Sequence, residues 1–313
     1  MNKPIIVTNE LKKEYGELKA VRGLSIEIAR GEIFGLLGPN GAGKTTTISM
    51  LTGLTEPSSG QIQIAGEEFS PTANKLKAKI GLVPQEMALY LGLSAWDNLI
   101  FFGQIYGLRG KQLRQRVESV LEMVGLADRA KDPVETYSGG MKRRINIAAG
   151  LLHEPELLFL DEPTVGVDPQ SRNAIFESVE ALNKAGMTII YTTHYMEEAE
   201  RLCNRIAIMD HGKVIAQDTP SALIRSLGGG LLRVGLVNGK LKAVSEQASL
   251  LKSTQEIWEH ENELVLQTLQ AQEALMGVLE ITNRLDAKVT SLQILEPNLE
   301  TVFLQMTGKN LRD

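Results

Sequence analysis

The sequence predicts an α/β protein built on a mostly parallel sheet, followed by a small α+β domain. A glycine-rich segment at 38–45 separates an apolar run from a helical pattern, the order of a strand, a phosphate-binding loop and a helix. Three more short apolar runs, at 157–162, 188–194 and 205–212, alternate with helical patterns, and such alternation builds a parallel sheet. Adjacent glycines at 228–230 are poorly placed in a helix or strand and mark a domain boundary.

Length and composition agree with two globular domains. The chain has 313 residues, of which 43% are hydrophobic and 23% charged, an ordinary balance for a soluble protein with a buried core. The formal net charge is −5 and the pI about 5.6, so the field of the whole protein does not favour the phosphates of nucleic acid. We therefore expect no nucleic-acid partner.

The single cysteine and the N-terminal residues indicate a cytoplasmic protein. Cys203 cannot form an intrachain disulfide, and its helical setting favours a packing role over a redox role. Residues 1–10 lack the charged and then apolar pattern of a signal peptide. No apolar run approaches the ~20 residues that cross a bilayer. We expect that the chain stays in the cytoplasm and transports nothing alone.

The first domain is expected at 1–227 and contains a helical insertion. Short strands are predicted within 4–11 and 19–29, before the strand, loop and helix of 31–54. From about 87 to 152 the pattern turns helical, with apolar residues at three- and four-residue spacing. The strands and helices that follow complete the sheet.

The second domain is expected at 231–313 as βαββαβ with a last helix, an order that matches a ferredoxin-like domain. Its apolar positions suffice for a small two-layer core. The predicted strands are 231–237, 253–260, 263–269 and 288–296, the predicted helices are 239–251, 271–285 and 298–308, and the core candidates are Leu264, Leu266, Leu292, Ile294, Val302 and Phe303.

The strongest motif is the segment at 38–45, which has the pattern G-x-x-x-x-G-K-[ST]. Glycines let backbone N–H groups surround phosphates, Lys44 supplies a point charge to the β and γ oxygens, and Thr45 can bind Mg²⁺. The alternative, an ordinary glycine turn before a helix, does not explain the lysine and threonine. The predicted ATP-binding residues here are Gly38, Pro39, Asn40, Gly41, Ala42, Gly43, Lys44, Thr45 and Thr46.

Two adjacent carboxylates end the apolar run at 157–162. They suit a division of labour in which Asp161 holds Mg²⁺ and Glu162 polarises the attacking water. Alone, such a run could be any buried strand with a polar end. Together with the phosphate loop, it predicts an ATPase site.

The segment Ser138-Gly139-Gly140 lies between these motifs and precedes a helical pattern. A bare Ser-Gly-Gly is a common turn, but here it resembles the signature loop of the ABC ATPase family, from which Tyr137 and Met141 depart at its two ends. The resemblance covers about residues 4–225. The motifs stand in the family's order: the phosphate loop, Gln85, the signature loop, Asp161-Glu162, Asp168 and His194.

The resemblance implies roles for four more residues. Tyr15 would stack on adenine, although a surface tyrosine is the plain alternative. Gln85 would sense Mg²⁺ and water, and His194 would contact the γ-phosphate, whereas an isolated glutamine or histidine is usually structural. Asp168 would link the two ATP sites across a dimer, although Asp-Pro is also a common helix start. With Lys44 and Glu162, His194 and Gln85 complete the predicted catalytic set.

The resemblance also implies the architecture and the partners. The family has an antiparallel N-terminal β subdomain and an inserted helical subdomain, and each ATP lies between the phosphate loop of one subunit and the signature loop of another. We therefore expect ATP and Mg²⁺ as ligands, a second nucleotide-binding domain in a homodimer, and a separate membrane permease. The whole pattern, including residues 296–308, resembles ATPase subunits of the drug-resistance exporter group. Export from the inner face of the cell membrane is the implied function.

The apolar segment at 87–106 bears on the permease. Most of its large apolar residues are expected in the core, and a minority to form a groove for a short helix of the membrane subunit. Two alternatives remain. A soluble ABC ATPase acting on ribosomes or DNA would usually carry two cassettes or a long coiled coil, and a P-loop kinase or other small-molecule NTPase would not explain the signature loop.

Overall fold

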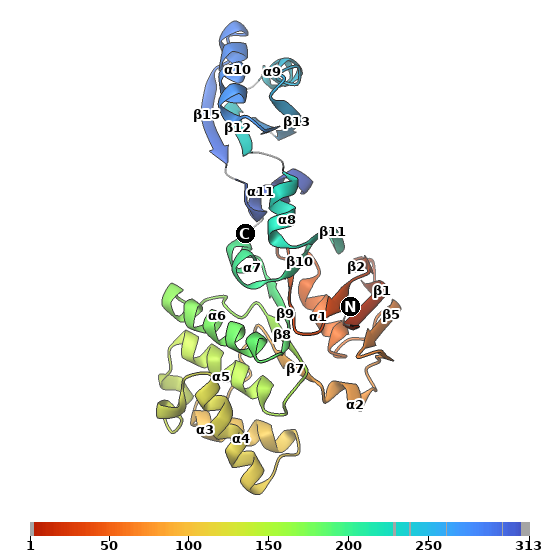
Figure 1. Cartoon of the computed structure of the whole chain (residues 1–313), viewed down its shortest axis with the longest axis vertical. Coiled ribbons are helices and arrows are strands. Elements are labelled where there is room, and N and C mark those ends of the chain that lie inside the picture. Colours follow the sequence, from red (N-terminus) through yellow and green to blue (C-terminus); the bar gives the residue numbers. More distant parts are fainter. Residues whose placement is uncertain (1–2, 228–229, 238, 261, 296, 308–313) are drawn as a thin grey trace. The chain divides into compact units, whose positions relative to one another are not determined.

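The computed structural model describes residues 3–307 except 228–229, 238, 261 and 296. The chain forms two compact units, Met1–Val214 and Ile215–Asp313, and the boundary falls within β11 (Lys213–Asp218). Two glycines of the predicted boundary, at 228 and 229, lie outside the described residues. Figure 1 shows the course of the chain through both units.

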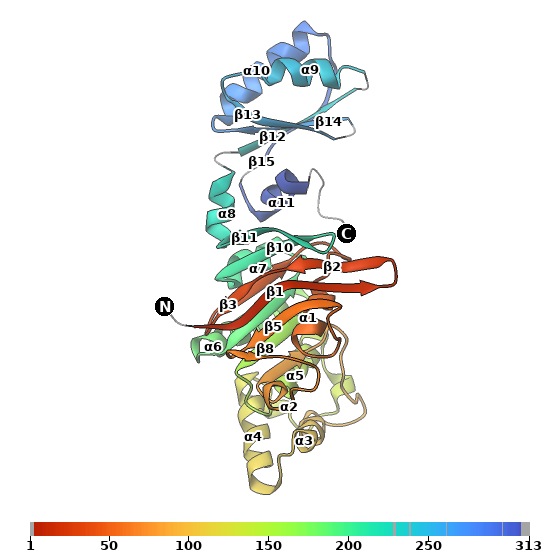
Figure 2. The same ribbon diagram turned by 90° about the vertical axis from the view of Figure 1, so that its right-hand side faces the viewer.

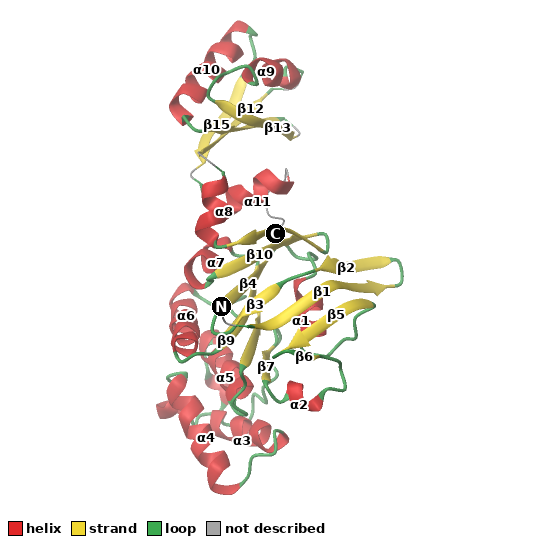
Figure 3. Ribbon diagram, turned by 45° about the vertical axis from the view of Figure 1, so that its right-hand side comes forward, coloured by secondary structure: helices red, strands yellow, loops and turns green. Residues whose placement is uncertain are grey.

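The first unit begins with an antiparallel sheet in the order β2-β1-β5-β6, with β3 also paired to β1 (Figure 3). Alternation decides which face is buried: Ile62 and Ile64 of β5 are buried, whereas Gln61 and Gln63 between and before them are exposed. The bounds are β1 (Pro4–Tyr15), β2 (Leu18–Leu24), β3 (Glu27–Ala29), β5 (Ser59–Ile64) and β6 (Glu67–Glu68).

A parallel sheet forms the centre of the first unit, with its strands in the order β10-β4-β9-β8-β7. Every residue of β4, β8 and β9 is buried, because helices and the antiparallel sheet cover both faces, and this explains the continuous apolar runs of the sequence. The bounds are β4 (Ile33–Leu37), β7 (Ile80–Val83), β8 (Leu157–Asp161), β9 (Thr188–Thr193) and β10 (Arg205–Asp210).

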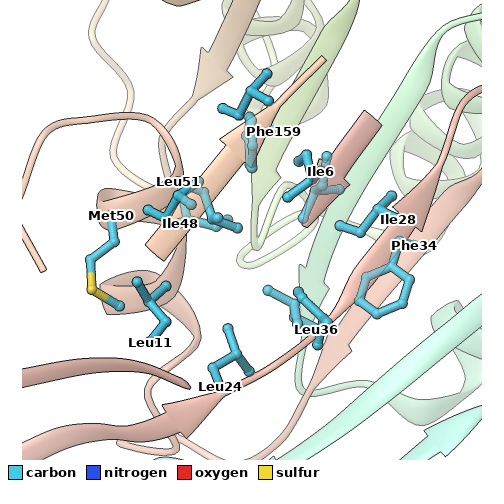
Figure 4. Packing of buried hydrophobic residues seen from close by; sticks show 14 of the residues in the cluster. Ile6, Leu11, Leu24, Ile28, Phe34, Leu36, Ile48, Met50, Leu51 and Phe159 are labelled. Carbon is cyan, nitrogen blue, oxygen red and sulfur yellow. The ribbon is translucent and has the colours of Figure 1, made fainter. Parts of the chain in front are cut away.

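The main core lies where the two sheets meet α1 (Lys44–Leu51), the helix that follows β4. Figure 4 shows Ile6, Leu11, Leu24 and Ile28 of the antiparallel sheet pointing toward side chains of β4, α1 and β8. The remaining helices of this part are α2 (Asn74–Lys77), α6 (Pro169–Lys184) and α7 (Met196–Leu202). The predicted α/β class is confirmed.

The helical insertion consists of α3 (Ala95–Ile105), α4 (Gly110–Met123) and α5 (Gly139–Leu151), with short 3₁₀ turns at Ala127–Arg129 and Val134–Thr136. Ser94 caps α3 by accepting the N–H of Asp97 at 3.0 Å. The buried side chains of α4 recur at helical spacing and face the other two helices. They are Leu113, Val117, Val120 and Leu121.

The expectation that residues 87–106 are mostly core is wrong. Among the large apolar side chains of this segment only Leu99 is buried, because one face of α3 and the preceding loop face solvent. Tyr90 and Phe101 contact each other edge to face, with ring centroids 5.0 Å apart. The exposed residues, named here the α3 patch, are Met87, Tyr90, Leu91, Leu93, Phe101, Ile105 and Tyr106.

The second unit contains the predicted βαββαβ order. Its four antiparallel strands run β13-β14-β12-β15, and α9 and α10 cover one face while α11 lies against the other (Figure 2). The bounds are α8 (Pro220–Ser226), β12 (Gly230–Leu236), α9 (Leu241–Ala248), β13 (Thr254–His260), β14 (Glu263–Thr268), α10 (Ala271–Arg284), β15 (Val289–Leu295) and α11 (Leu299–Thr307).

Four of the six core candidates of the second unit are buried, Leu292 is half-buried and Ile294 is exposed. Leu264 and Leu266 lie under α9 and α10, and Leu292 packs partly against them. Val302 and Phe303 of α11 are buried as well. Ile294 was predicted wrongly: it lies near the end of the edge strand β15, and its side chain is 48% exposed.

Cys203 directly follows α7 and packs inside the first unit. A Cβ on Gly35 would lie 2.8 Å from its Sγ, so the thiol fills the space that this glycine leaves. Burial raises the pKa of the Cys203 thiol, and the Glu198 carboxylate adds to that rise. The predicted packing role is thus what the environment supports. Within the described parts of the chain, we find no helix with the length and apolarity that crossing a bilayer requires.

The two units have separate cores, since no buried residue belongs to the main clusters of both. We therefore predict that a chain ending at Leu227 keeps the cooperative thermal unfolding of the first unit and loses a second transition of the full chain in calorimetry. In the full chain, Leu266→Ala should lower the free energy of unfolding of the second unit by about 2–5 kcal/mol. The first transition should stay unchanged. A truncated chain without any cooperative transition would show that the first core depends on the second.

Candidate functional site

The phosphate loop occupies the carboxyl end of β4, where two glycines are required. A Cβ on Gly38 would lie 2.2 Å from the Met209 carbonyl oxygen, and one on Gly43 would lie 2.6 Å from that of Ala20. Gly43 also adopts the left-handed φ of 102° just before α1 begins. The loop is therefore fixed between β10 and the β1–β2 hairpin. Its other predicted residues are Pro39, Asn40, Gly41, Ala42, Thr45 and Thr46.

Lys44 lies at the centre of this loop and is 4% exposed. Its Nζ donates hydrogen bonds to the carbonyl oxygens of Gly38 at 2.8 Å and Pro39 at 3.2 Å, and lies 3.0 Å from Oε1 of Glu162. Removing either member of such a buried ion pair leaves an uncompensated charge. Lys44, the first residue of α1, thus places its ammonium group at the edge of the parallel sheet.

Asp161 and Glu162 end β8 at the same edge, and Thr192 of β9 holds both. The Thr192 hydroxyl donates to Oδ1 of Asp161 at 2.7 Å and accepts the N–H of Glu162 at 2.9 Å. Glu162 has a φ of 45°, a left-handed conformation that costs on the order of 1 kcal/mol in a residue other than glycine. This conformation turns its side chain toward Lys44.

Gln85 and His194 complete a cluster around the Glu162 carboxylate. The Gln85 side-chain amide donates to Oε2 at 3.5 Å, and Nδ1 of His194 lies 3.2 Å from the same oxygen, at ion-pair distance but without hydrogen-bond alignment. Arg143 of α5 fixes the Gln85 backbone by donating to the carbonyl oxygens of Pro84 and Gln85, both at 2.8 Å. Burial lowers the pKa of Arg143.

Tyr15 lies apart from this cluster. It is half exposed at the end of β1, where Lys13 Nζ is 5.0 Å from its ring centroid. The hairpin that it closes contacts the phosphate loop through Ala20. Tyr15 is therefore on the element that borders the loop, and its ring is available to stack on a ligand.

The signature residues and Asp168 form a second group, at the starts of α5 and α6. Ser138 caps α5 by accepting the N–H of Met141 at 3.2 Å, and Asp168 caps α6 by accepting that of Ser171 at 3.0 Å. The bond from Ser171 also lowers the pKa of Asp168. A Cβ on Gly140 would lie 2.1 Å from Cβ of Ser171, so only glycine allows this contact.

No hydrogen bond or ion pair among residues 3–227 joins this second group to the phosphate loop. Gly139 is exposed, as are Ser138 and Asp168. Tyr137, which departs from the family pattern, is buried and donates its hydroxyl to the Arg129 carbonyl oxygen, so it is part of the core of the helical insertion. Within residues 3–227, the signature loop is therefore exposed and makes no hydrogen bond or ion pair with the phosphate loop of its own chain.

Sequence reasoning missed four buried polar residues next to the cluster: Thr164, Tyr191, Thr192 and Glu198. Burial raises the pKa of Tyr191 well above its ordinary value, and the nearby Glu198 carboxylate raises it further, so the hydroxyl stays a donor. The available signal was the hydroxyl-rich end of the apolar run at 188–193. Hydroxyl residues within an apolar run do not indicate a functional site until the groups that they bond to are known.

The residues present fit a nucleoside triphosphate and a divalent cation. Around Gly41 nothing lies within 4 Å of the position that a Cβ would take, so the loop backbone faces open space. The Thr45 hydroxyl and Oδ1 of Asp161 lie 3.4 Å apart and are hard oxygen ligands of the kind that Mg²⁺ binds. Glu162, the residue that follows Asp161, is paired with the buried Lys44 charge.

Comparison with known sequences finds a matching family model and similar curated proteins. A family model described as "ABC transporter" matches residues 21–165. The linearmycin resistance ATP-binding protein LnrL of Bacillus subtilis (strain 168) is 48% identical over 99% of this chain and 100% of its own length. A Nod factor export ATP-binding protein I of Ralstonia nicotianae is 39% identical over 99% of this chain and 96% of its own.

Solved structures give the same result for the first unit. The structure of cbiO1 from Clostridium perfringens, described as part of the ABC transporter complex cbiONQ, superposes with a TM-score of 0.66 at 31% identity. It covers 72% of this chain and 95% of its own. A dimeric post-hydrolysis structure of the ATP-binding cassette MJ0796 with ADP and Pi has a TM-score of 0.62 at 25% identity, covering 68% of this chain and 98% of its own.

The environment of Lys44 predicts that Lys44→Ala weakens ATP binding. Charged hydrogen bonds contribute about 1.5–3 kcal/mol, so the Kd for ATP measured by calorimetry should rise about 10–100-fold. Lys111→Ala, which removes an exposed lysine of α4, is the matched control and should leave the Kd unchanged. An unaltered Kd in a folded Lys44→Ala protein would remove Lys44 from the binding site.

Proposed function

The chain belongs to the ABC transporter ATP-binding family, in its drug-resistance and export group, and from this premise we propose that it hydrolyses ATP to power a membrane exporter. The observation that carries the proposal is the cluster at one sheet edge. Glu162 lies at its centre, within 3.5 Å of side chains of Lys44, Gln85 and His194. A carboxylate so placed beside a phosphate loop can serve as the base for a water nucleophile.

The ion pair suggests how ATP binding prepares the site. Without nucleotide, the Lys44 charge neutralises Glu162. Phosphate oxygens compete for the same ammonium group, and when Lys44 binds them the Glu162 carboxylate becomes free to accept a proton from water. His194 would contact the γ-phosphate and Gln85 the water, since both lie within 3.5 Å of the Glu162 carboxylate. Mg²⁺, held by Thr45 and Asp161, would neutralise charge that develops on the phosphates.

A second copy of the chain is proposed to complete each site. The exposed Ser138, with the first N–H groups of α5, is an anion-binding feature that its own phosphate loop does not use. In a dimer it would reach the γ-phosphate on the facing subunit, and Asp168 would lie between the two sites. The loss of that phosphate on hydrolysis would remove the shared ligand and open the dimer.

The membrane subunit is proposed to bind the α3 patch. The patch is apolar, solvent-exposed and begins two residues after Gln85, so a helix docked there lies beside the residue that contacts Glu162. A cavity of about 470 Å³ beside the patch, lined by Tyr106, Leu108 and His153 among others, adds concave surface. Through such a permease the protein would act at the inner face of the cell membrane.

The second unit is proposed to stabilise the dimer or its assembly with the permease. Residues 231–313 have no glycine-rich phosphate loop in their sequence and no cysteine. A second catalytic site there is therefore not expected. The rigid sheet of this unit, packed on both faces by helices, suits a binding role.

We predict that Glu162→Gln still binds ATP and hydrolyses it 10²–10⁴-fold more slowly, because a positioned base typically contributes that factor. Sedimentation with ATP should then show a persistent dimer. Glu177→Gln, an exposed carboxylate of α6, is the control and should turn over normally. Near-normal turnover of Glu162→Gln would contradict the assignment of the base and with it the proposed site.

The signature loop is tested by mixing variants. Ser138→Arg should lower ATPase activity and leave ATP binding to the monomer intact, because the side chain acts on the facing subunit. A mixture with Lys44→Ala should form one composite site with both defects and one with neither, so mixed dimers should regain part of the activity. Mixed dimers shown by sedimentation to form but lacking any activity would contradict independent sites shared between subunits.

A further inference from the structure

Glu198 is a fully buried carboxylate that the proposed hydrolysis does not use directly. It belongs to α7 and is 2% exposed. Its Oε1 accepts the Thr164 hydroxyl at 2.7 Å, and its Oε2 accepts the hydroxyls of Tyr191 at 3.0 Å and Thr193 at 2.8 Å. Three hydroxyl donors satisfy both oxygens of this buried carboxylate, and buried polar networks of this kind specify a unique geometry.

One donor ties Glu198 to the turn that carries Glu162. Thr164 lies two residues after Glu162, within a turn in which the N–H of Val165 donates to the Glu162 carbonyl oxygen at 3.3 Å. The left-handed conformation of Glu162 needs such external support, because the backbone alone does not favour it. Glu198 anchors this turn through the hydrogen bond from Thr164.

Another donor ties Glu198 to the turn that carries His194. Thr193 directly precedes His194, and its hydroxyl also accepts the N–H of Tyr195 at 2.9 Å. The same carboxylate therefore contacts the segments of both His194 and Glu162, which lie 32 positions apart in sequence and meet at Oε2 of Glu162. A substitution at Glu198 would therefore remove support from the Glu162 turn and the His194 turn at the same time.

Arg172 extends the network to α6, the helix that Asp168 caps. Its Nε lies 3.8 Å from Oε1 of Glu198, and its guanidinium lies 5.2 Å from the ring centroid of Tyr195. That ring in turn lies 4.1 Å from the ring of His194. The negative charge of Glu198, and not only its hydrogen bonds, therefore has a partner on α6.

We propose that Glu198 is a positioning residue for ATP hydrolysis, which fixes Glu162 and His194 relative to each other through Thr164 and Thr193. This rests on the proposed function, in which Glu162 is the base. A buried ion or polar network can often be replaced by apolar side chains without loss of stability, so stability alone does not account for a carboxylate here. Small displacements of a catalytic group, by contrast, cost up to 10²-fold in rate.

The test compares variants that keep the shape of the network. Glu198→Gln should lower kcat about 10–100-fold per ATP-binding site, with the KM for ATP within about threefold of the wild type. Thr164→Val, which removes one hydroxyl, should lower kcat, and Thr164→Ser, which restores it, should recover most of the rate. If Glu198→Gln fails to fold, the comparison of Thr164→Val with Thr164→Ser tests the proposal instead.

The matched control is Glu32→Gln. Glu32 is also buried, at 9% exposure, and accepts the N–H of Ala29 at 2.8 Å and a hydrogen bond from Arg205 at 3.3 Å, at the opposite end of the parallel sheet. It should lower the melting temperature without changing kcat per site. An equal loss of kcat in Glu32→Gln, or a Glu198→Gln protein with kcat within twofold of the wild type, would overturn the proposal.

Two further measurements separate this inference from the proposed function. In the double variant Glu162→Gln/Glu198→Gln, residual turnover should be no lower than in Glu162→Gln, because Glu198 acts only by positioning Glu162 and His194. A rate reduction in the double variant equal to the product of the two single reductions would overturn the proposal. Amide hydrogen exchange at Val165 and Tyr195 should be faster in Glu198→Gln, and unchanged exchange would also overturn it. A wild-type protein that binds ATP without hydrolysing it would contradict the proposed function, and the exchange rates would still test the positioning.

Discussion

The parallel register of three strands determines what meets at the site. Leu37 of β4 lies beside Thr193 of β9, and Asp161 of β8 lies beside Thr192, so these strands end level with one another. The residues that follow each strand are thus delivered to one edge, although the phosphate loop lies more than a hundred positions before Glu162 and His194 in the sequence. All the close contacts of Glu162 depend on this alignment, because a slip of one residue would turn each side chain to the other face of the sheet.

Buried charge is the second constraint on this edge. Glu162 is 5% exposed and Lys44 is 4% exposed, and neither could be desolvated alone at an acceptable cost. The sheet edge compensates with the ion pair between them, the Gly38 and Pro39 carbonyl oxygens that accept from Lys44, and the Gln85 amide that donates to Glu162. A site built in this way pairs its buried charges internally and yet consists of groups that phosphate and water can engage.

Some of the site was predictable because its residues follow from local chemistry. A glycine, lysine and threonine at fixed spacing after an apolar run predict a phosphate loop, and two carboxylates at a strand end predict metal and water contacts. Thr192 and Glu198 were not predictable, since a hydroxyl or carboxylate inside an apolar pattern gains meaning only from partners distant in sequence. The exposure of Phe101 and of Ile294 was missed for a related reason: apolar patterns predict burial, but only the tertiary arrangement decides which face is covered.

The contact between Gly140 and Ser171 joins the helical insertion to the parallel-sheet core. Because a Cβ at Gly140 would lie 2.1 Å from Cβ of Ser171, the first turns of α5 and α6 are packed without any intervening side chain. Close-packed backbones leave little room for relative displacement, so we expect the starts of these two helices to move together. We therefore expect a tilt of the helical insertion to be accompanied by a matching tilt at Asp168, because no side chain lies between the two helix starts to absorb it.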